Sequence, residues 1–198
     1  MYKTVVFDLD GTLLNTLTDL ADAGNRLCRK YGWPTHERQA YRYFVGNGIP
    51  KLVERLAPAD QRTPAVLEAA LADFKRDYGQ HLRDTTAPYP GIPEMLAKLK
   101  ANGVQLAVFS NKADALAKEV VKDYFGTQYF TIVRGQMTGV APKPAAEGTN
   151  ALLQALHADP ASTLYVGDSN VDVETAHNAN LPCCGAVWGF RTREELNA

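Results

Sequence analysis

Residues 3–12 read KTVVFDLDGT, an apolar run that ends in two aspartates, a glycine and a threonine. A short apolar run bounded by turn-forming residues is typical of a buried strand, and the polar residues behind it mark where that strand ends. Four later segments are similar apolar runs. The predicted strands are Lys3–Phe7, Val104–Phe109, Phe130–Val133, Thr163–Val166 and Cys183–Val187.

Segments with helical periodicity separate these strands. Apolar residues from Ile92 to Leu99 recur on one helical face, and Asn102–Gly103 ends that helix. We predict further helices over Asp114–Tyr124 and Glu147–His157. The alternation predicts an α/β fold in which helices cover a parallel sheet.

The stretch from Thr16 to Thr86 breaks this alternation, because it contains no segment typical of a strand. Helical faces run over Leu17–Tyr31, Ile49–Leu56 and Leu67–Tyr78. A purely helical block between the first and second strands indicates an insertion, which we interpret as a small cap over the site described below.

The predicted domains follow from this insertion. Residues 1–15 and 87–198 form the core, and residues 16–86 form a small α-helical cap inserted after the first strand. The segments Leu14–Thr16 and Thr85–Tyr89 are the expected hinges.

Composition narrows the class of protein. The 198 residues are 45% hydrophobic and carry a formal net charge of −1, which indicates a globular domain and argues against a general nucleic-acid binder. No run is long enough for a signal peptide or a membrane span. The cysteines, Cys28, Cys183 and Cys184, form neither a metal-spaced set nor a disulfide framework. We expect a cytoplasmic protein that does not contact membranes.

Charged and polar residues follow the predicted strands. Because ligands of open α/β sheets bind beyond the carboxyl ends of the strands, we expect these residues to meet in one site. Asp8, Asp10, Asp168 and Asp172 would bring up to four carboxylates together. Like charges at ~4 Å repel by about 4 kcal/mol even at an effective dielectric constant of 20. Such a cluster needs cations, and Mg²⁺ is the usual partner of oxygen ligands that leave room for phosphate.

This set of residues predicts phosphoryl transfer. Asp8 would attack phosphorus and form an acyl phosphate, and Asp10 would act as general acid and then general base. Asp8, Asp168 and the Asp10 carbonyl would bind Mg²⁺, while Asp172 would orient a metal-bound water or Lys143. Lys143 and Ser110, the latter near a helix start, would hold the phosphoryl oxygens. Further predicted members are Thr12 and Asn111 as phosphate contacts and Gly11 as the residue of a tight turn.

These residues resemble the motifs of the haloacid dehalogenase superfamily of phosphatases. The matching segments, in the family's order, are Asp8–Thr12, Ser110, Lys143–Pro144 and Gly167–Asp172. The resemblance implies a Rossmann-like core, a Mg²⁺ cofactor and a helical cap.

Within that superfamily the chain is most similar to phosphoglycolate phosphatases, through Val45–Ile49 and Val187–Arg191. Those phosphatases often have the motif Lys-Pro-x-Pro, where x is any residue. This chain departs from it, because Lys143-Pro144 is followed by two alanines. Members also commonly continue for another strand beyond the position of Ala198.

The substrate and some alternatives stay open at this point. We expect a small phosphorylated metabolite, with Gly46, Asn47 and Lys51 of the cap as candidate contacts and Arg42 and Arg55 as alternatives. A haloacid dehalogenase would not need Asp10. A phosphosugar mutase or a pyrophosphatase would keep the same core residues, and a silent phosphate-binding module would keep only the fold.

Overall fold

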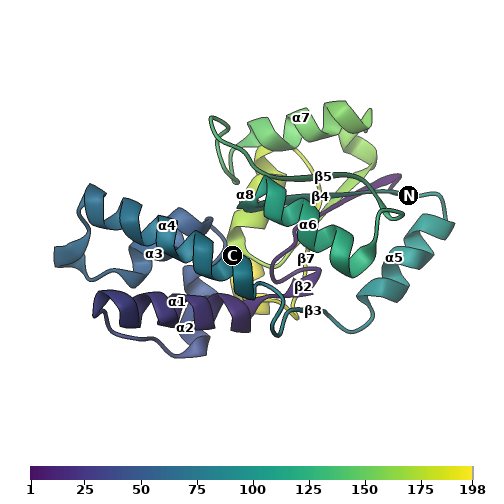
Figure 1. Ribbon diagram of the computed structural model, residues 1–198. Helices are drawn as coiled ribbons and strands as arrows, with labels where there is room; N and C mark the ends of the chain where they lie inside the picture. Colours follow the sequence, from purple (N-terminus) through teal and green to yellow (C-terminus); the bar gives the residue numbers. More distant parts are fainter. Residues whose placement is uncertain (198) are drawn as a thin grey trace. The chain divides into compact units, whose positions relative to one another are not determined.

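The computed structural model describes residues 1–197, and these fall into two compact units (Figure 1). One unit combines residues 1–15 with the chain from residue 88 onward, and the other comprises residues 16–87. None of the helices in residues 1–197 has the length and apolar character that crossing a membrane requires.

The first unit contains a five-stranded parallel sheet, so the predicted α/β fold is confirmed. The strands lie in the order β5-β4-β1-β6-β7. Their bounds are Thr4–Phe7 for β1, Gln105–Ala113 for β4, Phe130–Gln136 for β5, Thr163–Gly167 for β6 and Cys183–Gly185 for β7. If the five strands of this sheet are numbered 1 to 5 in chain order, they lie in the Rossmann-like order 3-2-1-4-5. The direction of winding reverses beside β1.

The central position of β1 follows from its residues. All four are buried, and two are valines, which suit a strand covered on both faces. Phe7 pairs with Val108 of β4 on one side and with Val166 of β6 on the other. The next residue, Asp8, therefore leaves the sheet at the point where the winding reverses.

The strand β4 extends further than its apolar run. Ser110, Asn111 and Lys112 belong to this strand, which pairs with β5 as far as Ala113 after an irregularity in the register. Helix α6 begins only at Asp114. The expectation that Ser110 stands near a helix start is therefore wrong, because the backbone pairing with β5 outlasts the hydrophobic pattern.

Helices cover the sheet of this unit. Val6, Ala107, Phe109 and Tyr165 point into a buried cluster together with apolar residues of α7 and α8, so these helices pack on one face. The helices and 3-10 turn of the unit are α5 Ile92–Ala101, α6 Asp114–Phe125, α7 Ala146–Leu156, η2 Pro160–Ser162, α8 Asn170–Asn178 and α9 Arg193–Leu196.

The second unit is helical. Its elements are α1 Leu17–Tyr31, α2 Arg38–Phe44, α3 Ile49–Leu56, η1 Ala59–Gln61 and α4 Pro64–His81. Two strands that the sequence analysis did not predict, β2 Leu14–Asn15 and β3 Ala87–Pro88, pair where the chain passes from one unit to the other. Two residues are too few to produce a period-two hydrophobic pattern.

Candidate active site

Residues from four parts of the chain meet at the carboxyl edge of the sheet. Asp8 follows β1, Ser110 lies in β4 beyond Phe109, and Asp168 follows β6. Lys143 comes from the loop between β5 and α7. The four side chains are nearly buried, so this is a site built into the fold and not a patch of surface charge.

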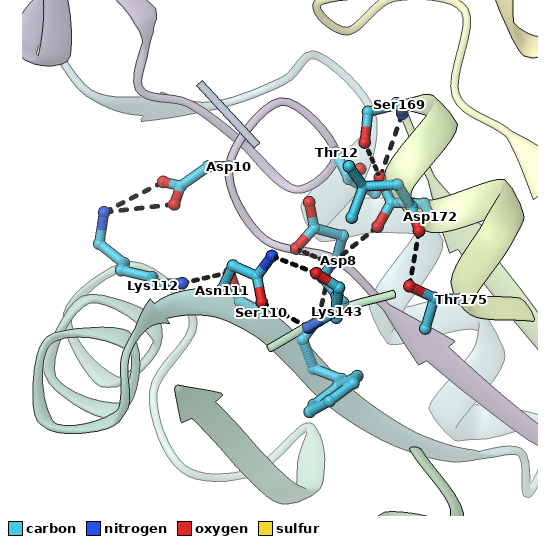
Figure 2. Close-up of polar contacts among 12 residues, drawn as sticks. Asp8, Asp10, Thr12, Ser110, Asn111, Lys112, Lys143, Ser169, Asp172 and Thr175 are labelled. Atoms are coloured by element: carbon cyan, nitrogen blue, oxygen red, sulfur yellow. Dashed lines mark hydrogen bonds and ion pairs between the residues drawn. The ribbon is translucent and has the colours of Figure 1, made fainter. Parts of the chain in front are cut away.

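The ammonium of Lys143 lies between two carboxylates (Figure 2). Its Nζ is 2.8 Å from Oδ1 of Asp8 and 2.7 Å from Oδ1 of Asp172. It also donates to the hydroxyl of Tyr165 at 3.2 Å and to the carbonyl of Phe109 at 3.3 Å. The contact with Asp8 is an ion pair without hydrogen-bond alignment, since Oδ1 of Asp8 has no hydrogen-bond donor among the described residues.

Asp172 is held on both of its oxygens. Oδ1 accepts from the ammonium of Lys143. Oδ2 accepts from the backbone N–H of Ser169 at 3.1 Å and from the hydroxyl of Ser169 at 2.7 Å. The two residues form a capping box that starts α8. Asp172 therefore fixes the lysine to the helix and has little capacity left for another ligand.

Asp168 lies in a closely packed pocket of backbone. It accepts from the hydroxyl of Thr12 at 3.0 Å and from the N–H of Phe190 at 2.7 Å. A Cβ added to Gly11 would lie 2.3 Å from Oδ2 of Asp168, and Gly11 also has a φ of 91°. Only glycine permits both the turn and the close approach. Gly189 also approaches Asp168 closely, because a Cβ added to it would lie 2.2 Å from the Cβ of Asp168.

Burial controls the protonation of this cluster. It raises the pKa of Asp8 to about 7, against the opposing effect of Lys143 and with a further increase from Asp172. Burial, with the charges of Asp172 and Asp8, also raises the pKa of Asp168 well above its ordinary value. Burial lowers the pKa of Lys143, but the carboxylates of Asp172 and Asp8 outweigh it, and the pKa is raised well above the ordinary value. Without a second cation, these buried carboxyls are thus held partly in their protonated form.

The residues present fit a divalent ion. Asp8, Asp168 and Asp172 each offer a carboxylate oxygen within 4.8 Å of the others. Since Asp172 is occupied by Lys143 and Ser169, the oxygens best placed for an ion belong to Asp8 and Asp168. A dense group of buried carboxylates whose pKa values are raised is a donor set for a hard cation such as Mg²⁺.

Asp10 lies apart from this cluster. Its carboxylate contacts Nζ of Lys112 at 3.1 and 3.4 Å, and Figure 2 shows this pair away from Asp8, Lys143 and Asp172. The backbone of Asp10 forms a bridge with Leu14, which anchors the turn.

Two predicted phosphate contacts have other partners in the structure. The amide of Asn111 donates to the carbonyl of Lys143 at 3.1 Å and accepts from its N–H at 2.8 Å, so it aligns the backbone of the lysine. The hydroxyl of Thr12 donates to Asp168, as described above. Ser110 is buried, and its Oγ accepts from the N–H of Lys112 at 3.2 Å.

Several members of the site were not predicted from the sequence. Lys112 and Tyr165 lie within strands, where a polar residue is hard to assign to either face before the register is known. Trp188, whose indole N–H donates to the carbonyl of Thr12 at 3.0 Å, and Phe190 come from the segment after β7. A signal was available in Gly189, because glycine often marks a close approach of backbone.

The candidate cap contacts lie in the helical unit, around the loop between α2 and α3. The guanidinium of Arg55 donates to the carbonyls of Tyr43 and Phe44 at 3.1 and 2.7 Å and to Oδ1 of Asn47 at 2.9 Å. Lys51 pairs with Glu54 at 2.9 Å on an exposed helix face. Arg55 therefore shapes the loop that carries Gly46 and Asn47.

Comparison with known proteins gives consistent results. The family model described as haloacid dehalogenase-like hydrolase matches residues 5–186. A phosphoglycolate phosphatase of Thiobacillus denitrificans is 31% identical over 191 residues, covering 95% of this chain and 84% of that protein. One from Neisseria meningitidis is 32% identical, with 95% and 81% covered. The crystal structure of a predicted phosphoglycolate phosphatase from Haemophilus somnus is similar with a TM-score of 0.86 at 28% identity, covering 95% of this chain and 86% of that one.

Proposed function

This chain belongs to the haloacid dehalogenase-like hydrolase family, and on that premise we propose that it is a Mg²⁺-dependent phosphatase acting through a phospho-aspartate on Asp8. The observation that carries the proposal is the contact of Asp8 with Lys143 within a cluster of buried carboxylates at the switch point of the sheet. A nucleophilic carboxylate needs a fixed position and a positive environment for the incoming phosphoryl group, and Lys143 supports both requirements.

In the proposed first step, a carboxylate oxygen of Asp8 attacks phosphorus and the bond to the leaving alcohol breaks. Lys143 stabilises the negative charge on the phosphoryl oxygens, with Ser110 as a further contact. Asn111 and Asp172 hold Lys143 through its backbone and its ammonium. Thr12 holds Asp168.

Asp10 carries the protons in this proposal. It protonates the leaving oxygen in the first step and then takes a proton from the water that hydrolyses the acyl phosphate. Its carboxylate lies outside the group formed by Asp8, Asp168 and Asp172, which suits a residue that must face the leaving group and not the metal.

Asp8, Asp168 and the carbonyl of Asp10 are the residues that would hold Mg²⁺. When bound, the ion neutralises negative charge on the phosphoryl group and on the crowded carboxylates. Asp172 would orient Lys143 or a metal-bound water.

Removing Mg²⁺ should abolish turnover. Hydrolysis of 4-nitrophenyl phosphate is expected with Mg²⁺ and should fall to background with excess chelator. Mg²⁺ at about 100 times its Kd should also stabilise the fold by about 2.7 kcal/mol, measured as a rise in Tm. Asp168→Asn should lose most of that rise. Full activity in chelator would contradict the metal assignment.

For the substrate we propose a small phosphomonoester of the phosphoglycolate type, acted on in the cytoplasm. The named activity of the relatives supports the substrate class. The free, exposed thiols of Cys183 and Cys184 suit a reducing compartment. We further propose that residues 16–86 act as a cap on a core of residues 1–15 and 87–198, and that Gly46, Asn47 and Lys51 contact the substrate.

A panel of phosphate esters tests the substrate proposal. Phosphoglycolate should be hydrolysed with a kcat/KM at least about tenfold above sugar phosphates, nucleotides and pyrophosphate, since one contact supplies the ~1.4 kcal/mol needed. Lys51→Met should reduce that preference, with exposed Lys98→Met as the matched control. A preference for pyrophosphate or conversion of a sugar phosphate to its isomer would favour a pyrophosphatase or a mutase, and no turnover at all would favour a silent binding module.

A further inference from the structure

The site contains a second buried lysine to which the reaction described above gives no task. The side chain of Lys112 is 3% exposed, and its ammonium pairs with Asp10, whose side chain is 14% exposed. Lys143 forms ion pairs with Asp8 and Asp172, whereas Lys112 forms an ion pair with Asp10. The two acids that follow β1 thus pair with different lysines.

The backbone of Lys112 is held in place within β4. Its N–H donates to Oγ of Ser110 at 3.2 Å within β4. On the other side, a Cβ added to Gly135 of β5 would lie 2.4 Å from the carbonyl oxygen of Lys112, so the two strands are in close contact there. Because its side chain is also only 3% exposed, Lys112 offers its ammonium to Asp10 from a confined position.

Asp10 needs such a partner for an electrostatic reason. It stands two residues from Asp8, which belongs to the group of three carboxylates within 4.8 Å of one another. A carboxylate without a cation of its own would be attracted to a divalent ion held there. It would then be unable to exchange a proton with the leaving group.

We propose that Lys112 is a positioning residue that holds the carboxylate of Asp10 out of the metal cluster and in place for proton transfer. The inference rests on the proposed function. It assigns the two buried lysines separate tasks: Lys143 acts on the nucleophile and the phosphoryl group, and Lys112 acts on the general acid.

The test compares Lys112→Met with the matched control Lys118→Met, which removes an exposed lysine that pairs with Asp114. The quantity measured is kcat/KM, because it reports the first step alone. With Lys112→Met we expect a loss of about 100-fold for an alkyl phosphate, whose poor leaving group needs a proton, and of about threefold for 4-nitrophenyl phosphate. The affinity for Mg²⁺, measured by calorimetry, should stay within about threefold of the wild type or become tighter.

Two further variants complete the test. Lys112→Arg should restore part of the alkyl phosphate activity, because it keeps the positive charge in a larger side chain. In an Asp10→Asn background, Lys112→Met should change kcat/KM by less than about twofold, because both changes remove the same function. Lys112→Gln replaces Lys112→Met in these assays if the methionine variant does not fold.

Three results would overturn the inference: equal losses for both esters, independent effects of the two changes, or a marked loss of Mg²⁺ affinity. Failure of the proposed function would look different, since the wild-type protein would then hydrolyse neither ester.

Discussion

Replacing Asp8 by asparagine is expected to reduce turnover by at least about four orders of magnitude while the protein stays folded. The amide keeps the shape of the side chain but cannot form the acyl phosphate. Asp8 lies at the end of the central strand, where its position depends on the pairing of Phe7 with both neighbouring strands, and the substitution does not alter that pairing. The measurement is single-turnover hydrolysis of 4-nitrophenyl phosphate, with the exposed Asp60→Asn as the matched control.

The stability of Asp8→Asn provides an independent measurement. The folded-state pKa of Asp8, about 7, is above the ordinary value of 3.8, so the wild type loses stability as pH rises from about 4 through 7. The asparagine variant lacks this ionisation. Without metal, the variant should be more stable than the wild type at about pH 8, by up to about 4 kcal/mol, and the difference should shrink near pH 5.

Acid quenching of the wild-type reaction identifies the nucleophile directly. Phosphate should be trapped on the peptide that contains Asp8 and should be released by hydroxylamine, as an acyl phosphate is. In Asp8→Asn no trapped phosphate is expected. Trapping on another residue, or wild-type turnover by the variant, would assign the nucleophile elsewhere.

The sheet could be predicted from the sequence because its strands are apolar runs that end at polar turns. Asp8 and Asp168 could be placed at the same edge from this pattern alone, since parallel strands end on the same side. The order of strands confirms that placement, with β1 between β4 and β6. Short runs of buried β-branched residues are the part of such a chain whose structure is easiest to predict.

Other parts of the site depend on register and could not be predicted in this way. The extension of β4 through Lys112 is a backbone property, set by pairing with β5 beyond the end of the apolar run. The contact of Asn111 with the backbone of Lys143 joins residues 32 positions apart, and no local pattern indicates it. Trp188 contacts the loop after β1 through Thr12, and Phe190 contacts Asp168 after β6, both from the far end of the chain.

Replacing Lys143 by methionine is the second change with a large expected effect. The variant should lose about 10²–10³-fold in kcat, because the phosphoryl group loses a preorganised positive charge. Stability should also fall by about 3–5 kcal/mol near neutral pH, the usual result when one partner of a buried ion pair is removed. Exposed Lys98→Met is the matched control and should change neither quantity appreciably.

The loss of stability in Lys143→Met should depend on pH with a defined sign. Lys143 opposes the rise in the pKa of Asp8, so without it that pKa should lie further above 7. A carboxyl whose folded-state pKa is raised stabilises the fold when protonated and loses that contribution as pH rises through the raised value. The difference in Tm from the wild type should therefore change little between pH 5 and 7 and widen as pH rises above 7. Adding Asp172→Asn should recover part of the loss, since it removes one of the two carboxylates that the lysine served. A difference in Tm that does not vary with pH would show that Lys143 stabilises the fold by packing and not by its charge.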